Sequence, residues 1–174
     1  AENVSPPLPP AEPIVNATHP PKIDGLLDPI WKHTPWVRDY VLCSGDTNAP
    51  FTDAALAWRG MWDADYLYLF ISVKDDTLNA DTQTGWHGDS VELWLDGDNS
   101  KAAAYDGIND LGFGWLFTGD ADDGVILADQ GEWRMSTTGH IAKVAKANGG
   151  LDLEIAIPMS NLGVAAPAPG HRMG

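Results

Sequence analysis

The sequence feature that most constrains the fold is an alternation of apolar side chains with a period of two. Leu67, Leu69, Ile71 and Val73 alternate with other residues over 66–74, and the same pattern recurs in 90–95 and 151–157. Side chains that alternate in this way lie on opposite faces of a β-strand. Five weaker strands are expected at 54–62, 111–117, 124–128, 132–136 and 140–146. The only helical segment expected is one turn at 28–32, with Asp28 as its N-cap and a proline in the first helical position.

Short strands joined by connections rich in Gly, Asp and Asn are typical of an all-β fold. We therefore predict an antiparallel β-sandwich of jelly-roll or immunoglobulin type, with a single core for the 174 residues. The C-terminal residues 171–174 resemble the beginning of another strand, so the sandwich is expected to lack its last strands. Either the chain is a fragment or a strand from another chain completes the fold.

The N-terminal residues form a separate region of the chain. Seven prolines fall within residues 5–21, which favours an extended linker or an arm that lies on the domain. The expected division is therefore an arm at 1–21 and a sandwich domain at 22–174. Because the chain begins with Ala1 and small residues flank secretory cleavage sites, we expect a mature protein that is secreted or at the cell surface.

The charge of the chain excludes some classes of partner. With 25 acidic and 10 basic residues, the formal net charge is −15. Such a surface repels nucleic acids and anionic lipids, and no cluster of Lys or Arg provides a local exception. No apolar run reaches the roughly 20 residues of a membrane-spanning helix. The single cysteine, Cys43, is expected to be a buried thiol.

A tryptophan in a polar loop is the best candidate for ligand binding. Trp86 lies within Thr84–Asp89, directly before the strand at 90–95, and an exposed indole can stack on a sugar ring. Glu92 and Trp94 are expected on the face of that strand that points away from the core, and Trp115 is a further candidate. The alternative interpretation, which spacing alone supports equally, is a solvated Glu92 beside a packed tryptophan. For tryptophans in general, packing in the core is the ordinary role.

Acidic side chains gather in three loops. Carboxylates from loops of this kind are the ligands that Ca²⁺ prefers, and a structural Ca²⁺ ion would offset the negative charge. Asp, Asn and Gly are also ordinary turn residues, and no loop has the complete twelve-residue calcium pattern. The candidate ligands are Asp96, Asp98, Asp106, Asp110, Asp120, Asp122 and Asp123.

Catalytic motifs are absent from the sequence. The five histidines are scattered, and no hydrolase, phosphate-loop or dinucleotide motif occurs. A glycosidase needs two carboxylates at a suitable separation. The nearest pair, Asp89 and Glu92, is expected on opposite faces of one strand, so we predict that the chain is not an enzyme.

Four segments carry motifs of one family: 22–31 contains Ile-Asp-Gly and a later Trp, 61–75 contains Trp-Asp and Leu-Tyr, 86–96 contains Asp-Ser-Val-Glu, and 151–158 ends in Ile-Pro. Together these segments resemble carbohydrate-binding module family nine. The resemblance implies a β-sandwich, bound calcium, and binding of sugars or glycan chain ends as an accessory to secreted polysaccharide-degrading enzymes. It assigns ligand contacts to Trp86 and Glu92. The family's second binding tryptophan and its asparagine would lie beyond residue 174. An arginine found in binding members is absent, because Gly114 follows Phe113.

Three functions are therefore expected, in decreasing order of support. The first is a non-catalytic, calcium-stabilised module that binds a polysaccharide or oligosaccharide beside a catalytic domain. The alternative is a structural or adhesive module of a cell-surface or fibrous assembly, completed by strand addition from a neighbouring subunit. The third is a haem-binding sandwich, since related sandwiches hold haem through Met and His, and Met61 and His171 are available.

Overall fold

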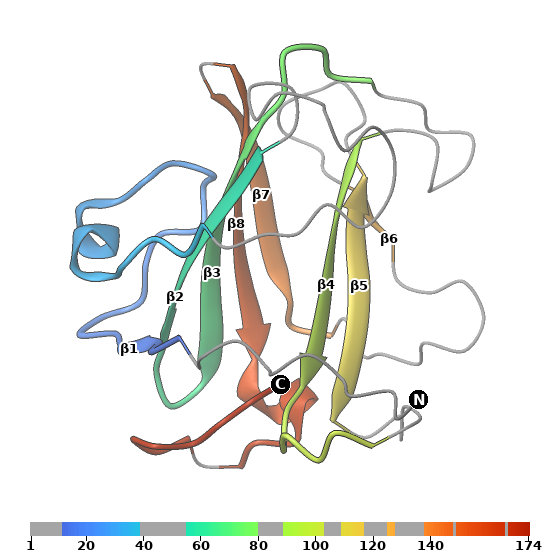
Figure 1. Ribbon diagram of the computed structural model, residues 1–174. Coiled ribbons are helices and arrows are strands. Elements are labelled where there is room, and N and C mark those ends of the chain that lie inside the picture. Colours follow the sequence, from blue (N-terminus) through green and yellow to red (C-terminus); the bar gives the residue numbers. More distant parts are fainter. Residues whose placement is uncertain are drawn as a thin grey trace, which may run out of the picture.

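The computed structural model describes residues 12–38, 55–79, 89–102, 109–116, 125–127, 138–147, 149–165 and 167–174. These residues form two facing β-sheets, one of five strands in the order β1-β2-β3-β8-β7 and one of three strands in the order β4-β5-β6 (Figure 1). The strands are β1 Val15–Asn16, β2 Ala55–Trp62, β3 Tyr66–Lys74, β4 Ser90–Asp96, β5 Asp110–Leu116, β6 Val125–Leu127, β7 Ile141–Ala147 and β8 Gly150–Pro158. Two short 3₁₀ helices, η1 (Pro29–His33) and η2 (Met159–Leu162), complete the described elements.

The predicted all-β sandwich is confirmed, and each described strand lies within two residues of its expected position except β1, for which no strand was expected. The expected strand at 132–136 and Cys43 lie outside the described residues. One pairing differs from the antiparallel prediction, because Val15 and Asn16 run parallel to β2. Among the described residues, no helix is long and apolar enough to cross a membrane.

The expected helical turn at 28–32 is present as η1, but Asp28 does not cap it with its side chain. Oδ2 of Asp28 instead accepts a hydrogen bond from the backbone N–H of Lys22 at 2.9 Å. The carboxylate therefore joins two parts of the N-terminal segment, and the helix depends on tertiary contacts for its position.

The alternating residues of β3 and β8 build the core between the two sheets. Leu67, Leu69 and Ile71 are buried there together with Leu153, Ile155 and Ile157. Val91 of β4 is buried against them from the opposite sheet. Burial of this apolar surface is the main force that holds the two layers together.

The outer face of the five-stranded sheet is also buried over β2, β3 and β8, because the N-terminal segment covers it there (Figure 1). Trp31 of η1 packs on Phe70 of β3, with ring centroids 5.7 Å apart, and both side chains are almost fully buried. Met61 and Tyr68 belong to the same outer cluster. Strands β2, β3 and β8 are therefore covered on both faces, by the second sheet on one side and by residues 12–38 on the other.

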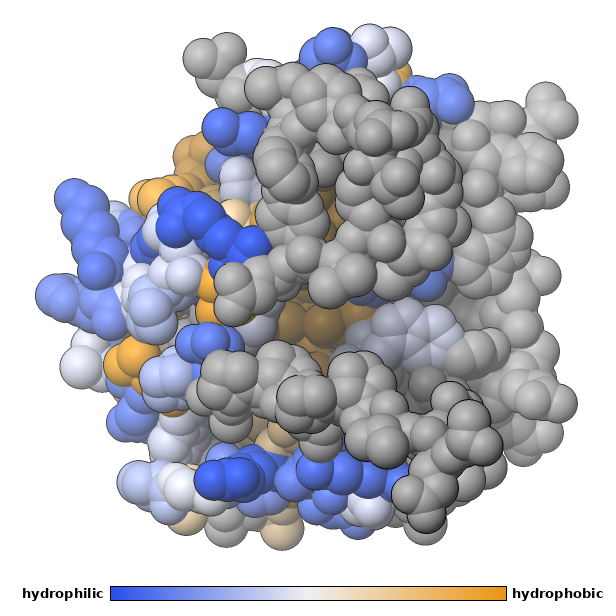
Figure 2. Space-filling view, in the orientation of Figure 1, coloured by the Kyte–Doolittle hydropathy of each residue, from blue (hydrophilic) through white to orange (hydrophobic). Residues whose placement is uncertain are grey.

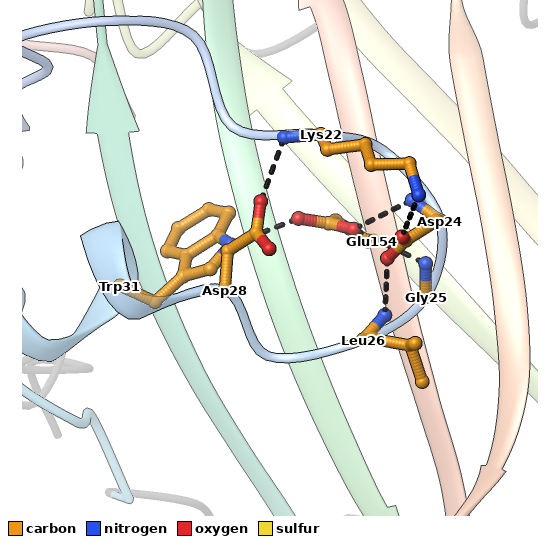
Figure 3. A network of polar contacts seen from close by, with 7 residues as sticks. All are labelled: Lys22, Asp24, Gly25, Leu26, Asp28, Trp31 and Glu154. Carbon is orange, nitrogen blue, oxygen red and sulfur yellow. Dashed lines mark hydrogen bonds and ion pairs between the residues drawn. The ribbon is translucent and has the colours of Figure 1, made fainter.

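A buried carboxylate fastens this N-terminal segment to the sheet. Oε2 of Glu154 in β8 accepts the backbone N–H groups of Asp24 and Gly25 at 2.9 and 3.1 Å. Oε1 accepts the indole N–H of Trp31 at 2.8 Å (Figure 3). Burial raises the pKa of the Glu154 carboxyl, and the hydrogen bonds from Trp31, Asp24 and Gly25 oppose that rise. Because three donors converge on two oxygens, this carboxylate has a structural role.

Trp31 is held at its backbone as well. The carbonyl oxygen of Trp31 accepts a hydrogen bond from Nη1 of Arg59 in β2, at 2.5 Å. The guanidinium of Arg59 lies over the ring of Trp36, 3.7 Å from its centroid, and only 6% of this residue is exposed. The register places Arg59, Phe70 and Glu154 side by side on β2, β3 and β8, so one row across the sheet anchors η1.

Candidate functional site

The outer face of β4 carries the candidate binding residues. Glu92 is exposed and the side chain of Trp94 is 41% exposed, whereas Val91, Leu93 and Leu95 pack toward the core. This arrangement confirms the alternation expected for 90–95. It also places a carboxylate and an indole two residues apart on one side of one strand, about 7 Å from each other along the strand.

Strand β5 contributes glycines to the same face. Gly114 is the register partner of Glu92, and Gly112 is the partner of Trp94. Residues directly opposite each other share a face of the sheet. Neither candidate residue therefore has a side chain directly beside it on β5. The pattern Gly-Phe-Gly is visible in the sequence, but its meaning depends on a register that the sequence does not reveal.

The other expected sugar-binding residues are placed differently. The register partner of Trp115 is Val91, so position 115 alternates along β5 with the positions of Gly112 and Gly114. The sheet therefore does not bring Trp115 together with Glu92 and Trp94. Trp86 lies outside the described residues.

Asp89, the other carboxylate near Glu92, is engaged with Asn79. Its Oδ2 accepts the backbone N–H of Asn79 at 2.6 Å, and its own N–H donates to the carbonyl of Asn79 at 2.9 Å. These bonds tie the chain before β4 to the segment after β3. Asp89 therefore serves as an anchor for the start of β4.

The turn after β4 holds two of the expected metal ligands. Asp96 accepts the backbone N–H groups of Ser100 through Oδ1 and of Lys101 through Oδ2, and Asp98 also accepts from Ser100. Burial alone would raise the pKa of Asp96, but the N–H groups of Lys101 and Ser100 outweigh it and hold that pKa below its usual range. The two carboxylates thus shape the turn, as in ordinary Asx turns.

Asp110, at the start of β5, lies directly opposite Asp96 in the register. In the described part of the chain, no three His, Cys, Asp or Glu residues come close enough together to hold a metal ion. The remaining expected ligands, Asp106, Asp120, Asp122 and Asp123, lie outside the described residues. Hydrophilic residues cover the lower end of the molecule, where the chain leaves β4 (Figure 2), while hydrophobic residues lie in the hollow between the sheets.

The residues considered for haem have other surroundings. Met61 is 1% exposed and packs in the outer cluster with Trp31 and Phe70. A ring nitrogen of His171, Nε2, lies 3.0 Å from the carbonyl oxygen of Gly97. Packing thus accounts for Met61, and a backbone contact accounts for His171.

The C-terminal residue extends the pairing of the smaller sheet. Asp96 and Gly174 exchange two backbone hydrogen bonds, of 3.0 Å from Asp96 to Gly174 and 2.8 Å in return. This exchange is the pattern of a directly opposed antiparallel pair. The sequence of residues 171–174 resembles the beginning of a strand. In agreement with this, Gly174 pairs like a strand residue with the edge of β4 that faces away from β5.

Solved structures share this architecture. A family 9 carbohydrate-binding module from Caldicellulosiruptor kristjanssonii, in complex with cellotriose, superposes with a TM-score of 0.73 at 25% identity, over 92% of this chain and 72% of that chain. A module of the same kind from that organism, in complex with glucose, gives a TM-score of 0.74 over 94% and 75% of the two chains. At 24% identity, the second match supports the fold alone.

Curated relatives match about half of the chain. Endo-1,4-beta-xylanase A of Thermotoga maritima is 36% identical over 86 residues, and exoglucanase XynX of Acetivibrio thermocellus is 33% identical over 86 residues. Each match spans 49% of this chain and 8% of the relative. The chain thus corresponds to a small part of these multidomain proteins.

A family model described as carbohydrate family 9 binding domain-like matches residues 23–174. This range contains all four segments that carry the resemblance, and the match agrees with the two-sheet fold. Domains of this kind bind carbohydrate and are not catalytic, which confirms the expectation that the chain is not an enzyme. The chain therefore belongs to the carbohydrate family 9 binding domain-like family.

Proposed function

We propose that the domain binds sugar rings on the outer face of β4, with Glu92 accepting hydrogen bonds from sugar hydroxyls. The observation that carries this proposal is the outward placement of Glu92 and Trp94 on a strand whose apolar residues Val91, Leu93 and Leu95 pack toward the core. A carboxylate on a rigid strand accepts hydroxyl donors without reorganisation, and an indole stacks on the C–H face of a pyranose. Trp86, six residues before Glu92, is proposed as the loop tryptophan of the same site.

The proposed ligand is a polysaccharide or one of its chain ends, and the proposed setting is an extracellular polysaccharide-degrading enzyme. The printed names of the relatives, a xylanase and an exoglucanase, support this setting, since both are much longer than the chain. A solved relative binds cellotriose, which supports a sugar ligand. Few contacts on an open strand leave little free energy beyond the cost of association, so the affinity should be modest.

Replacing Glu92 by glutamine is expected to weaken sugar binding about tenfold. The change keeps the shape of the side chain but removes the charge that strengthens hydrogen bonds from hydroxyls. Isothermal titration with glucose and cellotriose measures the effect. Glu12→Gln, at an exposed glutamate in the N-terminal segment, is the matched control and should bind as the unmodified domain does. Failure of the unmodified domain to bind any glycan in a broad array would contradict the proposal.

We also propose that Ca²⁺ stabilises the domain. The formal charge of −15 supports this proposal, and so does the direct opposition of Asp96 and Asp110, because like charges at such positions repel. The ion would hold acidic loops together without taking part in any reaction.

Chelation should therefore lower the melting temperature. A domain melted in excess EGTA is expected to unfold about 5 °C or more below the same domain in excess CaCl₂, because a bound ion stabilises only the folded state. A melt in NaCl at matched ionic strength separates specific binding from charge screening. Identical melting curves in EGTA and CaCl₂ would refute the calcium proposal.

A further inference from the structure

We infer that the outer face of β2, β3 and β8 also binds the N-terminal segment of a second copy of this chain, so that two chains that refold together exchange residues 12–38 and form a dimer. This inference is independent of the proposed sugar-binding function. Its basis is the set of contacts that fasten the segment to Arg59 and Glu154, which a second copy presents unchanged.

The first step is the charge pattern of this outer face. Arg59 and Glu154 flank Phe70 in one row across three strands, with their backbones about 10 Å apart. Only 6% of Arg59 and 0% of Glu154 remain exposed when the N-terminal segment is in place. An occupant that offered only apolar side chains would bury both charges without partners, which is strongly unfavourable. The face therefore selects against ordinary apolar partners.

The second step is the match between Trp31 and this pattern. The backbone carbonyl of Trp31 accepts a hydrogen bond from Nη1 of Arg59, and its indole N–H donates to Oε1 of Glu154. The backbone N–H groups of Asp24 and Gly25 donate to the other carboxylate oxygen (Figure 3). One segment thus supplies an acceptor to the cation and three donors to the anion. The occupant that fits is this sequence, from the same chain or from a second copy.

The third step is the edge of β2, which the N-terminal segment also covers. Val15 and Asn16 of β1 run parallel to β2, and Val37 exchanges two backbone hydrogen bonds with Trp58. Figure 1 shows the segment as one layer beside β2 and β3. Each of these contacts, like those to Arg59 and Glu154, joins the segment to a residue at position 58 or later. An exchange between two chains therefore conserves all of them, which is the condition for domain swapping.

The fourth step is the length of chain between the segment and β2. Residues 39–54 join the two, and a stretch of that length spans roughly 50 Å when extended. While the chain refolds, such a tether gives its own segment an effective concentration on the order of 1 mM. A second copy at a few tenths of that concentration therefore competes for the open face, and exchange should depend on protein concentration.

The first test refolds the unmodified domain from urea at about 2 μM and at about 400 μM, on either side of the range in which a second copy begins to compete. Both samples are then brought to the same low concentration and measured by size-exclusion chromatography with light scattering. We expect the dimer fraction to be about fivefold higher or more after refolding at the higher concentration. The dimer should persist for hours after dilution, because its segments separate only when the outer layer opens.

The second test identifies the exchanged segment by complementation. Trp31→Ala damages the segment and leaves the outer face intact, whereas Glu154→Ala does the reverse. A swapped dimer of these two variants contains one undamaged pairing of segment and face. Refolded together at high concentration, they should give about threefold more dimer than either alone, and native mass spectrometry should find both chains in it. Glu154→Ala refolded with Glu154→Gln is the control, since both chains are damaged on the same face, and it should show no gain.

Each contrary outcome overturns the exchange. Equal dimer fractions after refolding at the two concentrations would do so, as would a dimer that dissociates promptly on dilution, which indicates contact between surfaces. A persistent dimer without gain in the Trp31→Ala and Glu154→Ala mixture would show that another part of the chain is exchanged. Glucose titration of the monomer is unaffected by any of these results, because Glu92 lies on the other sheet.

Discussion

Replacing Glu154 by alanine is expected to lower the free energy of unfolding by about 4 kcal/mol. The change leaves three donors without an acceptor: the buried backbone N–H of Gly25, the buried indole N–H of Trp31 and the partly buried backbone N–H of Asp24. Each unsatisfied buried donor costs roughly 1–3 kcal/mol. Since domains of ordinary size are stable by only about 5–15 kcal/mol, the loss should be evident in urea unfolding monitored by tryptophan fluorescence.

Milder variants at the same position test the mechanism. Glu154→Gln keeps one acceptor oxygen, but its amide NH₂ group faces an N–H donor that the carboxylate accepts. This variant should lower the free energy of unfolding by about 2 kcal/mol. Trp31→Phe should lower the free energy of unfolding less in the Glu154→Gln background than in the unmodified domain. The reason is that phenylalanine has no indole N–H to face the amide NH₂ group of the glutamine. Glu92→Gln is the control, as it removes an exposed carboxylate and should leave the unfolding midpoint in place. Equal stability of Glu154→Ala and the unmodified domain would show that the network does not fasten the N-terminal segment.

The second large effect is expected at the hairpin between β7 and β8. Gly150 has φ +153°, and a Cβ atom there would lie 1.9 Å from the carbonyl oxygen of Val73. Gly150→Ala must therefore displace the backbone of β3 or break its pairing with β8. We expect a loss of about 3 kcal/mol, measured as the free energy of unfolding in urea.

The neighbouring glycine supplies a matched control. Gly149 also has a left-handed conformation, φ +78°, but a Cβ atom there would meet nothing within 4 Å. Gly149→Ala carries the conformational cost alone, about 1 kcal/mol. If the two alanine variants were equally stable, the close approach of Gly150 to β3 would not limit the fold.

The alternation in the sequence was sufficient to predict the strands but not the second buried layer. Tyr68 and Phe70 lie on the face of β3 opposite Leu67 and Leu69, and all four are buried. A strand that is apolar on both faces indicates that other parts of the protein pack on both of its sides. The sequence around the strand does not show which segment packs on the second side. Here the cover is the N-terminal segment, which packs on the sheet through Trp31.

Glu154 illustrates the same limit for polar residues. Its position in an alternating strand suggests an exposed face, but the residue is 0% exposed. The donors that make its burial possible come from positions 123 to 130 residues earlier in the chain. A single sequence contains no local signal for such a pairing.

The candidate site was predictable where it depends on one strand. The outward placement of Glu92 and Trp94 follows from the period of two within 90–95. The positions of Gly112 and Gly114 opposite Trp94 and Glu92, and the separate position of Trp115, depend instead on the register between β4 and β5. Residue type alone made Trp115 a candidate, and its register partner is Val91 rather than Glu92 or Trp94.

The bonds to Glu154 also dictate an order of assembly during synthesis. Residues 24–31 leave the ribosome long before the strand that receives them, which ends at Pro158. This segment must therefore wait, with the side chain of Trp31 exposed to water, until Glu154 has been made 123 residues later. Contacts of such long sequence separation slow folding, so closure of this outer layer should be among the last events in the maturation of the domain.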